Sequence, residues 1–192
     1  MRKNMLLTLI VLVIVLVAAA GCGKAGKGSG VLSGDSSDMA GWESIPYNTY
    51  GIKMQLPKSY RDYSGDSFLC FAGDENEWII AIGNFSHWIY GQKFENYVSD
   101  PLVLEYLIKA LDSANKDFVL EIAELTVIGG VDALRIKFSS TSDEKNRINE
   151  EYFFKNTRTP DQKLTKIAIA VQDFSDENLE VVEKIKDSIS ID

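Results

Sequence analysis

Residues 50–57 alternate between apolar and polar side chains. The apolar positions are Ile52, Met54 and Leu56, and the polar ones between them are Lys53 and Gln55. Successive side chains of an extended strand point to opposite faces of a sheet. The pattern therefore predicts a strand with one buried face, which ends at the proline that follows.

Three other segments are apolar at consecutive positions: residues 67–72, 78–85 and 167–171. Strands of this kind are typical of a sheet that is covered on both faces. Their connections are short, because residues 73–77 join the first two segments and Gly129-Gly130 forms a two-residue hairpin signal between residues 125–128 and 131–138. Short links indicate antiparallel neighbours.

Two helices are well marked. Asp100 is a capping residue and Pro101 suits the first helical position. The second helix is expected over residues 177–189, with Glu180 and Lys184 as a favourable pair one turn apart. The apolar stripes expected to face inward are Val103, Tyr106, Leu107, Ala110, Leu111 and Ala114 in the first helix, and Leu179, Val182, Ile185 and Ile189 in the second. An antiparallel sheet with flanking helices is an α+β sandwich.

The N-terminus has the pattern of a secretory signal, which we place at residues 1–21. Arg2 and Lys3 precede an apolar run over residues 5–20. As a helix this run would span roughly 24 Å, which is short of the ~30 Å hydrocarbon core of a bilayer. Small residues follow, as they do at a cleavage site. The alternative is an uncleaved transmembrane anchor.

The end of this signal, Ala19-Ala20-Gly21-Cys22, resembles the lipobox of bacterial lipoproteins. Ala19 stands where that family usually has Leu. The resemblance implies that the peptidase cuts before Cys22 and that this thiol carries lipid. The protein would then be lipid-anchored on the bacterial cell membrane, with its body on the extracytoplasmic side. Cys70 would be left without a disulfide partner, as an inert thiol in an apolar strand.

Charge separates a tether from a body. Residues 22–41 are rich in Gly and Ser and predict a flexible tether. Residues 42–192, which suit a single domain, hold 16 basic and 26 acidic residues, so the net charge of −8 for the whole chain becomes −10 for the body. A surface this acidic argues against nucleic acid as a partner, because phosphate binding needs basic side chains.

Three passages of the body resemble the PsbP-like superfamily, which includes PsbP, Mog and DcrB-type proteins: residues 50–57, 127–135 and 185–189. The order of the expected elements also resembles that superfamily. The resemblance implies an α/β/α sandwich with a binding or accessory role. The superfamily has no shared catalytic residues, so none is implied here.

The sequence offers little for catalysis or for metal binding. His87 is the only histidine, no nucleophile-elbow motif is present, and one His with two Cys cannot make the common zinc sites. Asp74, Glu75 and Glu77 lack the order of a calcium loop and are expected in a solvated turn. Residues 139–149 are expected to form a loop. We expect no cofactor and no metal.

The most unusual stretch is residues 84–94, where His87, Trp88 and Tyr90 are concentrated. Aromatic side chains with polar tips suit recognition surfaces, so we expect these three to line a ligand or partner patch. The alternative is that they cap the sheet as ordinary core.

These observations favour a non-catalytic binding or accessory lipoprotein of the cell envelope, whose partner is an envelope protein or a small ligand. Two alternatives stay open. A carrier of small ligands or lipids predicts an apolar cavity between sheet and helix. A hydrolase with a carboxylate pair predicts a cleft in which one carboxyl has a raised pKa.

Overall fold

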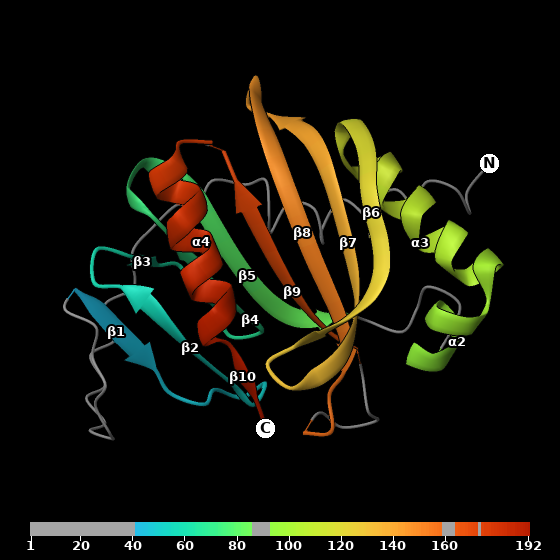
Figure 1. Ribbon diagram of the computed structural model, residues 1–192, viewed down its shortest axis with the longest axis horizontal. Coiled ribbons are helices and arrows are strands. Elements are labelled where there is room, and N and C mark those ends of the chain that lie inside the picture. The colour runs from blue at the N-terminus through green and yellow to red at the C-terminus, as the bar shows by residue number, and fades with distance from the viewer. Residues whose placement is uncertain (1–40, 86–92, 159–163, 173) are drawn as a thin grey trace.

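A seven-stranded antiparallel sheet forms the centre of the protein, in a computed structural model that describes residues 41–85, 93–158, 164–172 and 174–192. The strand order is β3-β4-β5-β9-β8-β7-β6 (Figure 1). The strands are β3 (Arg61–Asp62), β4 (Phe68–Ala72), β5 (Trp78–Phe85), β6 (Lys116–Ile128), β7 (Val131–Ser142), β8 (Lys145–Lys155) and β9 (Leu164–Val171), with a short 3-10 helix η1 (Asp74–Asn76) between β4 and β5.

Other elements cover both faces of this sheet. Helix α4 (Asp176–Ser188) lies in front of it in Figure 1, next to a small sheet of β1 (Trp42–Ile45), β2 (Ile52–Pro57) and β10 (Ser190–Ile191). Helices α2 (Phe94–Ser99) and α3 (Pro101–Ala114) pack on the rear face. The expected α+β sandwich is therefore confirmed. The alternating strand β2 has the predicted single buried face, but it belongs to the second sheet.

The two faces of the sheet contribute to two separate cores. Successive residues of β8 show this, because Phe154 belongs to the front core and Phe153 to the rear core. The front core joins β5 and β9 to β2 and α4, and the rear core joins β7 and β8 to α2 and α3. Cys70 is buried, as expected of a thiol in an apolar strand.

Both predicted helix starts are confirmed. The Asp100 carboxylate accepts a hydrogen bond of 2.9 Å from the Leu102 amide, and α3 begins at Pro101. The inward stripe is narrower than expected, because Tyr106 is 49% exposed. The fully buried positions are spaced four apart (Val103, Leu107 and Leu111), and Leu104 and Ala110 pack against the rear core while partly buried. In α4, Leu179 was also expected to face inward but is 37% exposed.

The predicted loop over residues 139–149 is wrong. Strand β7 continues to Ser142 and β8 begins at Lys145, so only Asp143 and Glu144 form the turn, both with positive φ. The alternation of apolar and polar residues is weak here, because both strands carry many polar side chains. These side chains find partners within the sheet, as where the Asn149 amide donates a hydrogen bond of 2.9 Å to the Ser140 hydroxyl. Within the described residues, no helix is long and apolar enough to cross a membrane.

Candidate functional site

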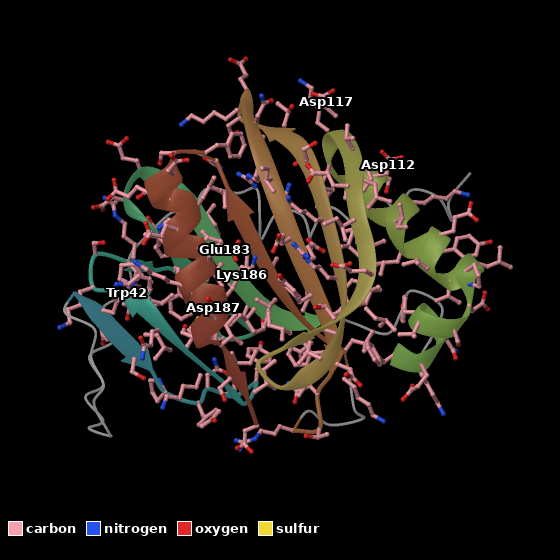
Figure 2. All side chains as sticks on the ribbon, in the orientation of Figure 1. Trp42, Asp112, Asp117, Glu183, Lys186 and Asp187 are labelled. Carbon is pink, nitrogen blue, oxygen red and sulfur yellow. The ribbon has the colours of Figure 1, made fainter. Side chains whose placement is uncertain are left out.

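An open cleft of about 630 Å³ lies on the front face of the sheet, between α4 and the β6–β7 hairpin. The end of β6 and the Gly129-Gly130 turn form one wall, and Glu183, Lys186 and Asp187 of α4 form the other (Figure 2). Arg135 of β7 and Tyr152 of β8 contribute to the lining between these walls. The cleft therefore draws its lining from elements far apart in the sequence.

The hairpin wall is held in a fixed position by the C-terminal strand. Gly129 and Gly130 both have positive φ, the backbone conformation that glycine adopts without strain. The Ile191 amide donates a hydrogen bond of 3.0 Å to the carbonyl oxygen of Gly129. A Cβ atom at Gly129 would lie 2.7 Å from Ile191 Cγ1, so the turn and β10 are in close contact. The predicted two-residue hairpin is confirmed.

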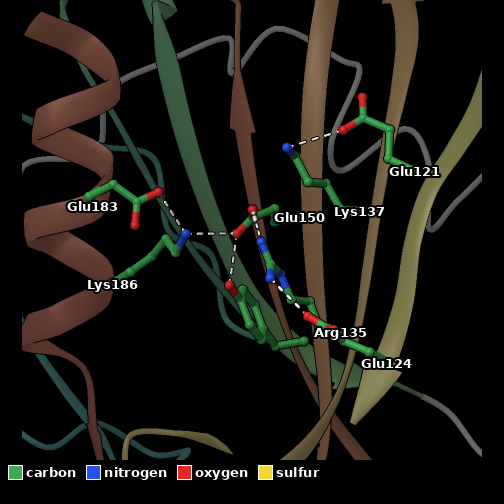
Figure 3. A network of polar contacts seen from close by, with 8 residues as sticks. Glu121, Glu124, Arg135, Lys137, Glu150, Glu183 and Lys186 are labelled. Atoms are coloured by element: carbon green, nitrogen blue, oxygen red, sulfur yellow. Dashed lines mark hydrogen bonds and ion pairs between the residues drawn. The ribbon is translucent and has the colours of Figure 1, made fainter. Parts of the chain in front are cut away.

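One carboxylate organises the floor of the cleft. Glu150 of β8 accepts hydrogen bonds from Arg135 Nη2 at 2.6 Å and from the Tyr152 hydroxyl at 2.7 Å. Lys186 Nζ reaches the second oxygen of the same carboxylate at 3.0 Å. Figure 3 shows that this network joins β7 and β8 to α4. Glu150 therefore ties the helix to the sheet through charged groups.

The network continues toward both sides. Lys186 also pairs with Glu183 at 2.8 Å on α4, and Arg135 also pairs with Glu124 of β6 at 3.0 Å. A parallel pair, Lys137 with Glu121 at 3.1 Å, connects β7 and β6 (Figure 3). Both cations of the floor thus have two carboxylate partners each, so the charges along this face largely neutralise one another.

The protonation states in the cleft follow from this geometry. Burial alone would raise the pKa of Glu150, but the hydrogen bonds from Arg135, Tyr152 and Lys186 outweigh burial and lower that pKa to about 2. Burial, and then the bond to Glu150, raise the pKa of the Tyr152 hydroxyl above its usual value. At neutral pH the carboxyl is ionised and the hydroxyl is protonated. Neither is poised to exchange a proton.

Two smaller clefts are also open to solvent. One of about 430 Å³ lies next to Asp74, Glu77 and Lys145, and one of about 390 Å³ lies next to Lys53 and Lys184. None of the three clefts is the enclosed apolar cavity that a carrier predicts. The space between the sheet and α4 is filled by side chains of the front core, including Ile80, Ile169, Val182 and Ile185.

The residues singled out in the sequence lie elsewhere. Cys22, His87, Trp88 and Tyr90 all fall outside the described residues, so the lipid anchor and the aromatic patch stay predictions. The acidic turn after β4 lies at η1 as expected. Among the residues that the structure describes, no group of three or more His, Cys, Asp or Glu side chains is placed to hold a metal ion.

Sequence reasoning missed the floor of the cleft. Arg135, Glu150 and Lys186 belong to three elements, and no local motif links them. One signal was present: Arg135 and Lys137 alternate with the apolar residues Leu134, Ile136 and Phe138, so two charges lie on one face of this strand. A charge there needs a partner on the same face of the sheet.

Comparisons with known proteins support the fold. No protein-family model and no curated protein matches the chain. Among solved structures, the chain is similar to the cyanobacterial PsbP of Synechocystis sp. PCC 6803, with a TM-score of 0.52 and 9% identity over 84% of this chain and 99% of that one. The chain therefore has the α+β sandwich fold of PsbP, as the resemblance implied.

Two further solved structures match less well. The Ran-binding protein Mog1p of Saccharomyces cerevisiae has a TM-score of 0.49 and 7% identity, over 78% of this chain and 95% of that one. A protein from Bacteroides thetaiotaomicron has a TM-score of 0.46 and 13% identity, over 78% of this chain. The chain spans about half of that protein's length, 48%.

Proposed function

We propose that this protein is a lipid-anchored, extracytoplasmic binding protein with a non-catalytic, accessory role in the bacterial cell envelope. The observation that carries the proposal is the open cleft with its fixed, ion-paired floor. Its two walls expose charged and hydroxyl groups, among them Asp187 and Ser190, on rigid elements. A surface of this kind suits a polar patch on an envelope protein more than an apolar small molecule.

The same floor favours binding over catalysis. A general acid or base works best when its pKa lies near the operating pH. The hydrolase alternative predicted a carboxyl with a raised pKa, whereas the pKa of Glu150 is lowered to about 2 by the groups around it. Arg135, Tyr152 and Lys186 are all engaged by that carboxylate. The floor is therefore fixed, and a partner would contact the polar groups of the cleft's rim, among them Asp187 and Ser190.

The anchor can be tested by metabolic labelling with an alkyne-bearing palmitate. We expect the full chain expressed in bacteria to be labelled, and the Cys22→Ala variant to lose the label. The matched control is Cys70→Ala, which removes the other thiol and should retain the label. Mass spectrometry of the mature chain should find Cys22 at its N-terminus. Labelling that persists in Cys22→Ala would contradict the anchor.

The cleft can be tested by crosslinking in cells. A photoreactive amino acid placed at Asp187 or at Ser190 would face a partner bound in the cleft. The control position is Glu144, an exposed residue at the β7–β8 turn that does not line the cleft. The proposal expects a discrete envelope-protein adduct from the two cleft positions and none from the control. Equal adducts from all three would refute the cleft as the binding surface.

A further inference from the structure

The two edges of the large sheet differ sharply. Strand β3 at one edge has only two residues, Arg61 and Asp62, and both are exposed. A short, charged edge strand protects a sheet against pairing with other chains. Strand β6 at the other edge is much longer, with 13 residues (Figure 1).

Only the second half of β6 is regular. Its pairing with β7 shifts register between Lys116 and Val119 and again between Leu120 and Ile122. From Ile122 to Ile128 the register is unbroken. This regular edge, residues 122–128, is about 24 Å long at ~3.4 Å per residue and contains neither Pro nor Lys. Apart from Glu124, it lacks the charges and prolines that usually blunt an exposed edge.

The rear side of this edge is apolar and exposed. Ala123, Leu125 and Val127 alternate along it and point to the same side as the rear core. Leu125 is 56% exposed and Val127 is 63% exposed, so α2 and α3 do not cover them. Large aliphatic side chains exposed at an open edge form an apolar patch, which is typical of a surface that binds another protein.

The front side of the edge carries two polar residues between Ile122 and the buried Ile128. Glu124 and Thr126 alternate along it. Glu124 is bound to Arg135 of the neighbouring strand at 3.0 Å, which draws its side chain toward β7 and away from the outer edge. The carboxylate is nevertheless about half exposed, so it can accept a second cation.

We propose that residues 122–128 add an extended strand from a partner protein, along the outer side of β6, whose last three residues also line the cleft. The added segment would carry aliphatic side chains at alternate positions, against Leu125 and Val127, and a Lys or Arg opposite Glu124. A basic segment is also favoured by the net charge of −10 over residues 42–192. A second copy of this chain is disfavoured, because two equally acidic bodies repel one another.

The probe for this surface is a blocked eight-residue peptide that alternates Val and Lys, with a Val/Glu peptide as its charge-reversed control. The full chain is purified in detergent and binding is followed by fluorescence anisotropy, with amide hydrogen exchange to locate the site. We expect the Val/Lys peptide to bind and to slow exchange in residues 122–128, and the Val/Glu peptide to bind at least about tenfold more weakly.

Two variants distinguish binding at the β6 edge from nonspecific hydrophobic binding. Leu125→Lys/Val127→Lys should weaken binding of the Val/Lys peptide about tenfold, while Leu102→Lys, at an equally exposed position on α3, should leave it unchanged. Far-UV circular dichroism checks that each variant is folded. Equal binding of both peptides, protection outside residues 122–128, or a dimer in sedimentation that the β6 variant dissolves would each overturn the proposal. Because the crosslinking positions Asp187 and Ser190 lie outside residues 122–128, the two proposals can fail independently.

Discussion

The Glu150 network should make a measurable contribution to stability, and Glu150→Gln is the substitution that tests it. Glutamine keeps the size and an acceptor oxygen but removes the charge that Arg135 and Lys186 share. Lowering the pKa of Glu150 from 4.5 to about 2 corresponds to roughly 3 kcal/mol at neutral pH. Solvent screening at the floor of an open cleft reduces this to about 2 kcal/mol.

The pH dependence of this effect has a definite sign. The pKa of Glu150 is near 4.5 when unfolded and about 2 when folded. The stabilisation is therefore complete above about pH 5 and is lost as the pH falls toward 2, where the carboxyl becomes protonated in both states. We expect the difference in free energy of unfolding between the wild type and Glu150→Gln to shrink over that interval.

Urea unfolding followed by circular dichroism at pH 7, 5, 4 and 3 measures both quantities. The matched control is Glu180→Gln, which removes an exposed pair with Lys184 and should leave the free energy of unfolding unchanged. A Glu150→Gln variant as stable as the wild type at pH 7, or a difference that does not vary with pH, would refute the assigned role of the network.

Two further predictions concern the hairpin wall and the rear core. Gly129→Ala should lower the free energy of unfolding by about 2–4 kcal/mol, because its Cβ would meet Ile191. Gly130→Ala has open space around its Cβ and should lower it by only about 1 kcal/mol. Equal losses for the two variants in urea titrations would contradict the contact between Gly129 and Ile191. Leu107→Ala, at a position 1% exposed, should lower the free energy of unfolding by about 3 kcal/mol. Leu102→Ala, at a position 63% exposed, should lower it by less than about 0.5 kcal/mol. Equal melting temperatures for the two variants would show that α3 does not pack as described.

Local signals in the sequence predicted a large part of the fold. The start of α3 follows from Asp100 and Pro101, since an N-cap and a first-turn proline act on neighbouring residues. The hairpin at Gly129-Gly130 follows from the backbone freedom of glycine. The polar strands β7 and β8 were not recognised near their turn, because their polar residues are satisfied by partners on neighbouring strands.

Alternation along strands, the starts of helices and the residues that turn the chain were all readable from the sequence, because those properties depend on contacts within a few residues. The sequence also supplied the resemblance to the PsbP-like fold. Two features could be seen only in the folded chain: Arg135, Glu150 and Lys186 meet at the floor of one cleft, and residues 122–128 form an open edge of the large sheet. Ion pairs and sheet edges depend on which distant strands and helices become neighbours, and burial of the two hydrophobic cores settles that arrangement.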